Sequence, residues 1–461
     1  MASNKSQIKT LLILGASGDL TARLLLPGLG QLLSSNRGHG IKLIGAAIDP
    51  MTKSAWTARV RKSFATVGAK SRSVTAALDS TQYVQADITS PQEMTKLLAM
   101  CDGVPAIYFA LPPAITAKTI DALQEVDLPT GTVLLMEKPF GVDEQSARAL
   151  NKKAAALVPE NQIHRVDHFL GKSTVLNFLG VRFANRIFEA SWSNLHIERI
   201  DIVFDESLAL ENRARYYDKA GALVDMIQSH LLQVLALMTC ESPATTNADD
   251  LRDSTAQALR ATRLWKDDPI TAGRRARYTA GKIGSKSIVS YAKEPGIDPS
   301  RKTETLAELT VEVRTARWAG VPITLRSGKA MGADRFEALV TYKPVSHLPT
   351  GLKGTAEPNV LKLGLGDHNT IALCIDVNGP GDPFELGRAN LFSDPGAGEF
   401  EAYGEVLLAA IDGDPSLSVR GDMAEQCWRI VDPVLRAWRA DKVPLQQYKA
   451  GSTGPKGWMI E

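Results

Sequence analysis

The chain has 461 residues, of which 44% are hydrophobic and 23% are charged. These proportions are typical of folded globular proteins and exclude disordered, collagen-like and coiled-coil classes. Lysine and arginine number 53 against 51 aspartate and glutamate, and the resulting formal charge is +2. So balanced a chain is not expected to have nucleic acid or an anionic membrane as its main partner, and any basic site must be local.

Length and cysteine content predict two or three domains in a reducing compartment. The length allows roughly 100–200 residues for each domain. The four cysteines are widely separated and show neither paired-thiol nor zinc spacing, so we expect no metal site. Residues 1–10 lack the apolar core of a signal peptide, and no stretch approaches the ~18 uninterrupted apolar residues of a membrane span. We therefore expect a cytoplasmic protein.

The first third of the chain alternates short apolar runs with helical segments. The runs that predict buried strands are Thr10–Leu14, Ile41–Ile48, Gln82–Ala86, Ala106–Leu111 and Thr132–Met136. A helix is predicted over Asp143–Leu157, with Asp143 near its cap. This alternation predicts an α/β fold, with a Rossmann-like, doubly wound parallel sheet over residues 1–170.

The remainder, residues 171–461, predicts a C-terminal α+β domain with a large, mainly antiparallel sheet. Its period-two runs are Ile197–Phe204, Leu306–Arg314 and Val360–Leu365. An apolar stripe over Leu223–Met238 predicts a core helix. The Gly-, Arg- and Ser-rich stretch Asp267–Lys302 predicts a long surface loop.

A glycine-containing turn follows the first predicted strand directly. It consists of Gly15, Ala16, Ser17, Gly18, Asp19 and Leu20. The order of strand, turn and helix lets a pyrophosphate approach backbone N–H groups and a helix N-terminus. An ordinary tight turn explains two glycines equally well, so both interpretations stay open.

Two later motifs place charged residues after predicted strands. Lys138, in Glu137–Gly141, stands just beyond the carboxyl end of a strand, where doubly wound folds bind ligands, and the proline after it is a candidate cis residue. The alternative is a strand that ends at a proline beside an exposed lysine. Arg165–Lys172 brings together a carboxylate, an imidazole and cations, and a charged surface turn is its alternative.

His230 lies inside the apolar helical stripe, with Asp225 and Gln228 nearby. A histidine in this setting is commonly a satisfied core residue. A partly buried imidazole near a carboxylate is also how a general base is adjusted to work near neutral pH. The choice depends on whether another segment brings a carboxylate to it.

Together these segments resemble the glucose-6-phosphate dehydrogenase family over nearly the whole chain. Further matching segments are Arg182–Asn185, Gly221–Gln233, Arg317–Pro322, Arg326–Lys329, Trp428–Pro433 and Tyr448–Pro455. The resemblance implies oxidation of the anomeric carbon of D-glucose 6-phosphate to the 1,5-lactone, with hydride transfer to NAD or NADP. This reaction is the first step of the oxidative pentose phosphate pathway or of a related glucose-oxidising route.

The resemblance also assigns roles. His230 takes the proton of the anomeric hydroxyl, Asp167 orients the imidazole, and Lys138 bridges substrate and cofactor. Three donors surround the sugar phosphate and two carboxylates bind sugar hydroxyls: His168, Lys172 and Lys329, then Glu206 and Asp225. The cofactor contacts are Gly15, Ser17, Gly18, Asp19, Leu20, Asp49 and Lys138.

Departures from the family pattern lie mainly in the cofactor site. Leu24 and Ile48 stand where the family commonly has cations for the 2′-phosphate of NADP, and Asp49 follows the second strand. An acidic residue there accepts hydrogen bonds from a free ribose hydroxyl and repels a phosphate. We therefore expect a preference for NAD, with NADP retained as a second cofactor through Arg23.

Near the sugar phosphate, Phe169 replaces the family's usual tyrosine and Ser173 replaces a common glutamate. Alternative substrates are therefore a sulfonated glucose or unphosphorylated glucose. A catalytically silent scaffold is the alternative of another class, and the presence of His230, Asp167 and Lys138 argues against it. The resemblance further implies a homodimer or homotetramer assembled through the large second sheet.

Overall fold

The structure is a computed structural model that describes residues 8–35, 40–211, 214–379 and 381–458. Its described residues divide into two compact units. The first takes residues from 1–172, 243–253 and 398–425, and the second takes them from 173–242, 254–397 and 426–461. Two later segments of the chain thus join the N-terminal segment in the first unit.

The first unit is built on a seven-stranded sheet. Its strands are β1 (Ile8–Leu14), β2 (Lys42–Ala47), β3 (Gln82–Gln85), β4 (Val104–Phe109), β5 (Val133–Glu137), β6 (Ile163–Val166) and β18 (Ser418–Val419). The order is β18-β6-β5-β4-β1-β2-β3, and all neighbours are parallel except β18, which runs antiparallel to β6. This order confirms the predicted Rossmann-like, doubly wound sheet.

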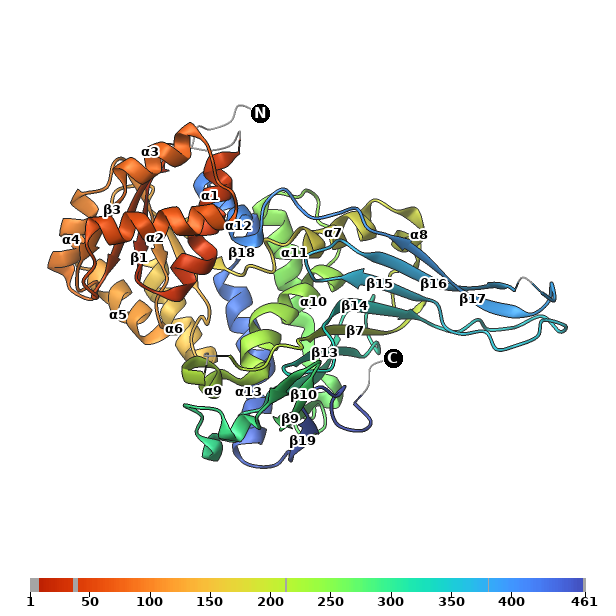
Figure 1. The fold of residues 1–461 in the computed structure, drawn as a ribbon. Coiled ribbons are helices and arrows are strands. Elements are labelled where there is room, and N and C mark those ends of the chain that lie inside the picture. Colours follow the sequence, from red (N-terminus) through yellow and green to blue (C-terminus); the bar gives the residue numbers. More distant parts are fainter. Residues whose placement is uncertain (1–7, 36–39, 212–213, 380, 459–461) are drawn as a thin grey trace. The chain divides into compact units, whose positions relative to one another are not determined.

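Helices cover both faces of this sheet (Figure 1). They are η1 (Thr21–Leu25), α1 (Leu26–Ser34), α2 (Lys53–Thr66), α3 (Arg72–Ser80), α4 (Pro91–Ala99), α5 (Pro113–Leu123), α6 (Glu144–Ala155) and α12 (Ala402–Asp412), with a 3-10 turn η2 (Glu160–Gln162). Strand residues such as Leu12, Ile13 and Leu134 are fully buried between them. Asp143 caps α6 through the N–H of Ser146 at 2.8 Å, which is where the sequence predicted the helix start.

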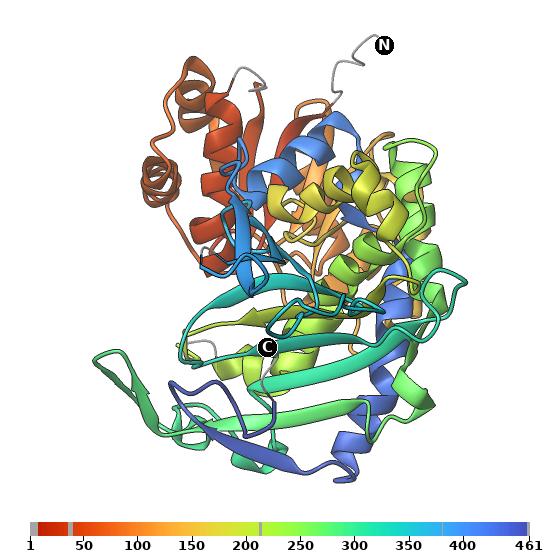
Figure 2. The ribbon, with the colours of Figure 1, turned by 90° about the vertical axis from the view of Figure 1, so that its right-hand side faces the viewer.

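The second unit carries a ten-stranded, mainly antiparallel sheet, as predicted (Figure 2). Its strands are β7 (Ile197–Asp205), β8 (Thr262–Leu264), β9 (Gly273–Thr279), β12 (Leu306–Val313), β13 (Ile323–Gly328), β14 (Arg335–Tyr342), β15 (Val360–Gly364), β16 (Ile371–Asn378), β17 (Leu386–Ser393) and β19 (Leu445–Lys449). Two pairs are parallel, β7 with β13 and β9 with β19. The first of these pairs positions part of the site.

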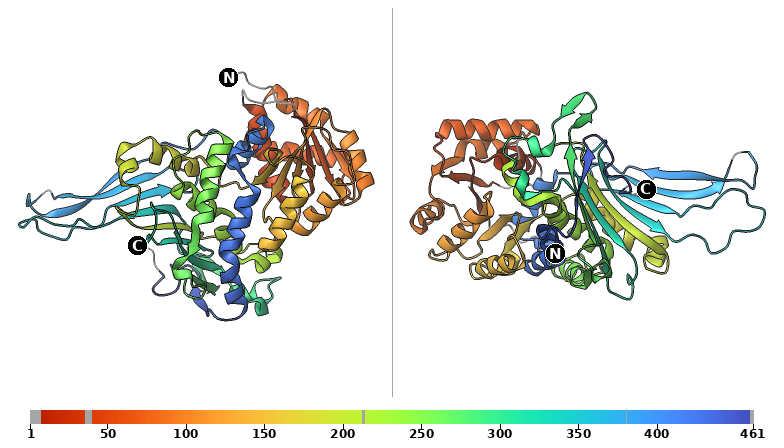
Figure 3. Two further views of the ribbon diagram at one scale, coloured as in Figure 1. Left: turned by 180° about the vertical axis from the view of Figure 1, so that it is seen from behind. Right: turned by 90° about the horizontal axis from the view of Figure 1, so that it is seen from below.

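The remaining longer helices are α7 (Ser173–Phe183), α8 (Arg186–Ser191), α9 (Ala214–Ala222), η3 (Leu223–Leu231), α10 (Leu232–Thr239), α11 (Ala248–Ala261) and α13 (Gly421–Arg439). Figure 3 shows α13 in blue beside α11, where Arg429 donates to the carbonyls of Leu259 and Thr262. The stretch Tyr216–Thr239 is long and apolar enough to span a membrane by composition, but 89% of its apolar window is buried. It is the core helix that the sequence predicted.

The prediction of a long surface loop over Asp267–Lys302 is wrong. Strand β9 of the large sheet lies within it, followed by a hairpin of β10 (Gly281–Ile283) and β11 (Lys286–Ile288). Arginine content suggested exposure, but Arg275 is buried and donates to the carbonyl of Val443 at 2.7 Å. An arginine can lie in a sheet interior when neighbouring oxygens accept its N–H groups.

Candidate active site

The glycine turn lies at the carboxyl end of β1, between β2 and β4. Gly15 has φ 86°, and a Cβ added there would lie 2.3 Å from the carbonyl oxygen of Ala110. Its N–H donates to the carbonyl of Ala46 at 2.8 Å, so the turn is held to the neighbouring strand β2 and packs closely against the residue that follows β4. Only glycine allows this backbone course, and the order of strands reverses at the same place, where doubly wound folds bind nucleotides.

Asp49 joins the turn from the end of β2. Its carboxylate accepts a hydrogen bond from Ser17 Oγ at 2.5 Å. Arg59 of α2 donates to the carbonyls of Ser17 and Gly18 at 2.8 and 2.7 Å. Sequence analysis missed Arg59, because nothing in the pattern of α2 separates an arginine that holds a loop from one that faces solvent. Leu24 and Ile48, at the expected cation positions, are exposed.

Lys138 follows β5, and its peptide bond with Pro139 is cis. Before it, the partly buried Glu137 accepts hydrogen bonds from the hydroxyls of Tyr108 and Tyr403, the latter at 3.2 Å. Burial raises the pKa of the Glu137 carboxyl, while the Tyr108 hydrogen bond and the Lys138 charge oppose that rise. The residue before the predicted lysine is thus part of a polar network that the sequence did not reveal.

Asp167 and His168 follow β6 directly. Asp167 is 1% exposed and accepts the N–H of Phe169 at 2.9 Å. Burial raises the pKa of Asp167 to about 6, and the charges of His168 and Lys138 act in the opposite direction. The His168 ring stacks on Tyr403 with centroids 5.8 Å apart, and the Lys172 ammonium lies 5.1 Å from the centre of the Phe169 ring. The alternative of a charged surface turn is therefore wrong.

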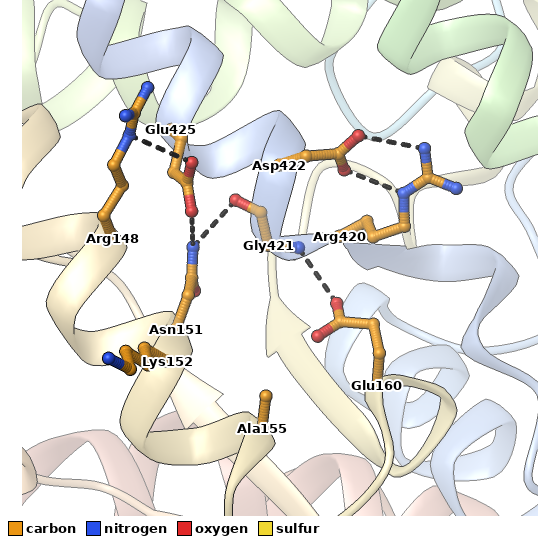
Figure 4. Close-up of a pocket in the computed structure, with 9 residues that line it drawn as sticks. All are labelled: Arg148, Asn151, Lys152, Ala155, Glu160, Arg420, Gly421, Asp422 and Glu425. Atoms are coloured by element: carbon orange, nitrogen blue, oxygen red, sulfur yellow. Dashed lines mark hydrogen bonds and ion pairs between the residues drawn. The ribbon is translucent and has the colours of Figure 1, made fainter.

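Arg165 lies on β6, two residues before Asp167, and is fully buried. Its hydrogen bonds hold this segment in place. Its Nε donates to Asn151 Oδ1 at 2.9 Å, and its guanidinium pairs with Glu160 at 2.6 Å. Glu160 also accepts the N–H of Gly421 at 2.9 Å, and Asn151 donates to the carbonyl of Gly421 at 2.9 Å. Asn151, Glu160 and Gly421 form one wall of a hollow of about 420 Å³, which Arg148 also lines (Figure 4). The wall fixes the strand that leads into Asp167.

In the second unit, Lys329 and Glu206 follow two parallel neighbours, β13 and β7. Parallel strands end at the same edge, and the register pairs Gly328 with Asp205. Lys329 is 5% exposed, and its ammonium lies 2.6 Å from the Glu206 carboxylate. It also lies 5.5 Å from the centre of the Tyr217 ring. A buried ammonium beside a carboxylate whose side chain is 21% exposed offers a donor and an acceptor to a polar ligand.

His230 and Asp225 lie on η3, a π-helical stretch continuous with α10. Both are buried, with 0% and 3% of their surfaces exposed. Gln228 on the same segment is also buried. Buried polar groups on an otherwise apolar core helix are costly unless each has a hydrogen-bond partner.

The structure thus groups the predicted residues in two sets. The first unit holds the glycine turn with Asp49, and also Lys138, Asp167, His168 and Lys172. The second holds Glu206, Asp225, His230 and Lys329. The pairing of Asp167 with His230 stays a prediction. Tyr108 and Tyr403 were missed because a buried tyrosine in an apolar run gives no signal of its hydrogen-bond partner.

A glycine turn on the first strand of a Rossmann-type sheet, followed by charged residues after its neighbours, defines a dinucleotide-binding protein. Comparison with known proteins gives the family. Residues 12–177 match the model of the NAD binding domain of glucose-6-phosphate dehydrogenase, and residues 179–459 match its C-terminal domain. The chain belongs to the glucose-6-phosphate dehydrogenase family.

Relatives of similar length support this assignment. The glucose-6-phosphate 1-dehydrogenase of Gluconobacter oxydans is 38% identical, covering 96% of this chain and 94% of its own. That of Treponema pallidum is 35% identical over 97% and 92% of the two chains. A solved structure of the enzyme from Mycobacterium avium has a TM-score of 0.85 at 32% identity, covering 98% of this chain and 96% of its own. Another, in complex with glucose 6-phosphate, has a TM-score of 0.88 at 27% identity, covering 99% and 97%.

Proposed function

We propose that this protein oxidises the anomeric carbon of D-glucose 6-phosphate to 6-phospho-D-glucono-1,5-lactone, with a nicotinamide as hydride acceptor. The observation that carries the proposal is the buried Lys329 paired with Glu206, in a member of this family. An ammonium held at a strand end can donate charge-assisted hydrogen bonds to a phosphate, and the carboxylate beside it suits a sugar hydroxyl. The reaction would open the oxidative pentose phosphate pathway or a related route, in the cytoplasm.

In this proposal the chain's own residues carry the proton chemistry and the binding. His230 accepts the proton of the anomeric hydroxyl, and Asp167 orients the imidazole and stabilises its charged form. His168, Lys172 and Lys329 neutralise the phosphate, while Glu206 and Asp225 accept hydrogen bonds from sugar hydroxyls. Lys138 donates to oxygens of substrate and cofactor.

The activity test compares His230→Asn with a matched variant, His347→Asn, whose side chain is exposed in the same unit. Removal of a general base lowers kcat by roughly 100–10,000-fold. We expect that loss for His230→Asn, with glucose 6-phosphate binding by calorimetry changed little, and wild-type rates for His347→Asn. Undiminished turnover in His230→Asn would remove this residue from the base role, and an inactive wild type would refute the activity.

The cofactor is proposed to be NAD in preference to NADP. The glycine turn and the carboxylate of Asp49 fit a dinucleotide with a free ribose hydroxyl, and the bound nicotinamide supplies the hydride acceptor. Asp49 is held beside the turn by Ser17, while Leu24 and Ile48 offer no charge to a 2′-phosphate. Arg23 pairs with Asp19 at 3.3 Å on the surface, a weak pair that leaves NADP as a second cofactor.

Steady-state kinetics with both cofactors test this preference. We expect kcat/KM to be higher with NAD than with NADP in the wild type. The double variant Ile48→Arg with Asp49→Ser should reverse the ratio, because it adds a phosphate partner and removes a repulsion. Leu24→Ala is the matched control, since it changes the same site without changing charge. A clear NADP preference in the wild type contradicts the proposal.

A second candidate substrate is a glucose with a sulfonate, or no anion, at its far end. Phe169 motivates it, because this ring is 1% exposed and brings no hydroxyl to the segment that carries His168 and Lys172. Parallel assays of glucose 6-phosphate, glucose and the sulfonated sugar separate the candidates. Turnover of the sulfonated sugar without turnover of the phosphate would favour the second candidate.

A homodimer or homotetramer is the proposed assembly. Strand β17 lies at the end of the strand order of the large sheet, and Leu391 and Phe392 on it are 56% and 67% exposed. An exposed apolar edge strand favours pairing with another chain, and a second copy is the partner that the family resemblance implies.

A further inference from the structure

The segment that carries Asp225 and His230 begins just after a break in the backbone. Gly221 has φ 68° and ψ 174°, which is not helical. A helix that starts anew leaves its first N–H groups without partners inside the helix. Here the N–H of Leu223 donates to Glu304 Oε1 at 3.0 Å, and the N–H of Ala222 donates to the main-chain carbonyl of Glu304 at 3.3 Å.

Glu304 and Gly221 fit each other closely. A Cβ added at Gly221 would lie 2.3 Å from Glu304 Oε1 and 2.6 Å from its Cδ. Glu304 is 6% exposed, and burial of a carboxylate is costly unless donors surround it. The start of a helix supplies both N–H donors and the favourable end of the helix dipole. The glycine thus leaves room for an acidic side chain that caps η3.

The residues on either side of Glu304 form hydrogen bonds with the backbone of Lys329 and of Asp218. The carbonyl of Thr305 accepts the N–H of Lys329 at 2.9 Å, and Tyr448 donates its hydroxyl to the Lys329 carbonyl at 2.6 Å. Thr303 donates to the carbonyl of Asp218 at 2.6 Å. The short stretch Thr303–Thr305 therefore fixes the backbone of Lys329 as well as the start of η3.

We propose that Glu304 is a positioning residue that sets where η3 begins, and through the helix backbone sets the places of Asp225 and His230. The inference rests on the proposed function for the roles of those two residues. Asp225 and His230 lie two and seven residues after Leu223, whose N–H is capped, and all three belong to one continuous helical segment. A shift of the helix start therefore displaces both side chains.

The charge of Glu304 should respond to pH near neutrality. Burial raises the pKa of Glu304 to about 7, and the N–H of Leu223 and the positive charge of Arg275 on β9 oppose that rise. The other titratable groups that face it are Tyr217 of α9 and Tyr291 of the 3-10 turn Tyr291–Lys293. Because a carboxylate accepts a backbone N–H better than a carboxylic acid does, the cap should weaken as the pH falls through 7.

The experiment uses Glu304→Ala and Glu304→Gln, with Glu312→Ala and Glu312→Gln as matched controls. Glu312 lies on β12 of the same unit and pairs with Arg314. Two quantities are measured: hydrogen exchange of peptides that cover 216–231, and kcat/KM for glucose 6-phosphate from about pH 5 to about pH 9.

We expect Glu304→Ala to speed exchange at the start of η3 and to lower kcat/KM by roughly 10–100-fold, since displacements near 1 Å cost that much. Glu304→Gln keeps a neutral acceptor for the Leu223 N–H at every pH. It should retain most of the activity at high pH. As the pH falls, its kcat/KM should decrease with one titrating group fewer than in the wild type. The Glu312 variants should match the wild type.

Unchanged exchange at the start of η3 in Glu304→Ala overturns the inference, and so does faster exchange with kcat/KM within about threefold of Glu312→Ala. If Glu304→Ala does not fold, an unaltered acid limb in Glu304→Gln overturns it. A wild type that does not oxidise glucose 6-phosphate refutes the proposed function instead, and the exchange data then decide by themselves whether Glu304 caps η3.

Discussion

Asp167 makes the stability of the protein depend on pH through one buried carboxyl. Its pKa is raised from 3.8 to about 6 by burial, so the folded state holds its proton more tightly than the unfolded state. Stability therefore falls as the pH rises from about 4 to about 6, by about 3 kcal/mol for a shift of about two units, and the loss is complete above that window.

Asp167→Asn should remove this pH-dependent loss of stability. We expect the free energy of unfolding to rise by up to about 3 kcal/mol at about pH 8 and to change little at about pH 4, because the amide stays neutral. The same variant should lose most of its turnover if Asp167 orients His230. Urea unfolding at both pH values, with Asp79→Asn as the exposed control, measures the effect. Equal effects at both pH values would contradict it.

At the scale of single residues, the sequence indicates which residues are candidates for the site, but it does not indicate what packs around them. The chemistry of segment Arg165–Lys172 indicates a candidate site, but from the residues alone a charged surface turn is the competing interpretation. Burial of Arg165 and Asp167 decided between them. Their partners, Asn151 and the N–H of Phe169, show why: a buried charge is tolerated where neighbours satisfy it, and those neighbours are known only once the chain has folded.

Among the secondary-structure elements, β6 is held in place by the hydrogen bonds and the ion pair of Arg165. Arg165 there joins η2, α6 and β18 through Glu160, Asn151 and the carbonyl of Val419. The side chain of Glu160 is 35% exposed, so its carboxylate stays partly solvated when Arg165 is removed. The buried Asn151 Oδ1 would lose its hydrogen bond, and a buried polar group left without a partner costs about 1–3 kcal/mol. Arg165→Ala should therefore lower the free energy of unfolding by that amount.

Arg148→Ala is the matched control on the same wall. Arg148 pairs with Glu425 at 3.3 Å, and its side chain is 60% exposed. An exposed pair contributes about 0–1 kcal/mol, so this variant should stay near the wild type in urea unfolding. A loss for Arg165→Ala no larger than that of Arg148→Ala would contradict the anchoring role.

Elements with regular periodicity were predicted well from sequence. The runs that became β1, β2, β4, β5, β7, β12 and β15 stood out because buried strands are apolar and half-buried strands alternate. Strand β9 was not predicted, because its arginines interrupt the alternation of apolar and polar residues that indicates a strand. Arg275 is buried while Arg274 is exposed, and composition alone cannot separate them.

For the whole molecule, the exposed edge of the large sheet carries the prediction about assembly. Phe392→Asp places a charge on strand β17 where the ring is 67% exposed. If β17 is buried between two copies, desolvation of this charge should convert the assembly to single chains in light scattering. Val345→Asp, at a side chain that is 61% exposed outside the sheet strands, is the control. A wild-type mass for Phe392→Asp would exclude β17 from the interface.

The sequence by itself determined the family, the Rossmann-like sheet and the antiparallel second sheet, and it supplied the candidate site residues. These follow from local patterns, since periodicity, turn glycines and motif spacing are properties of neighbouring residues. Only the tertiary structure decided which groups meet across distant segments: Ser17 with Asp49, Tyr403 with His168, and Glu304 with the start of η3. Such contacts depend on how sheets and helices pack, and burial then sets the pKa of Asp167 and Glu304.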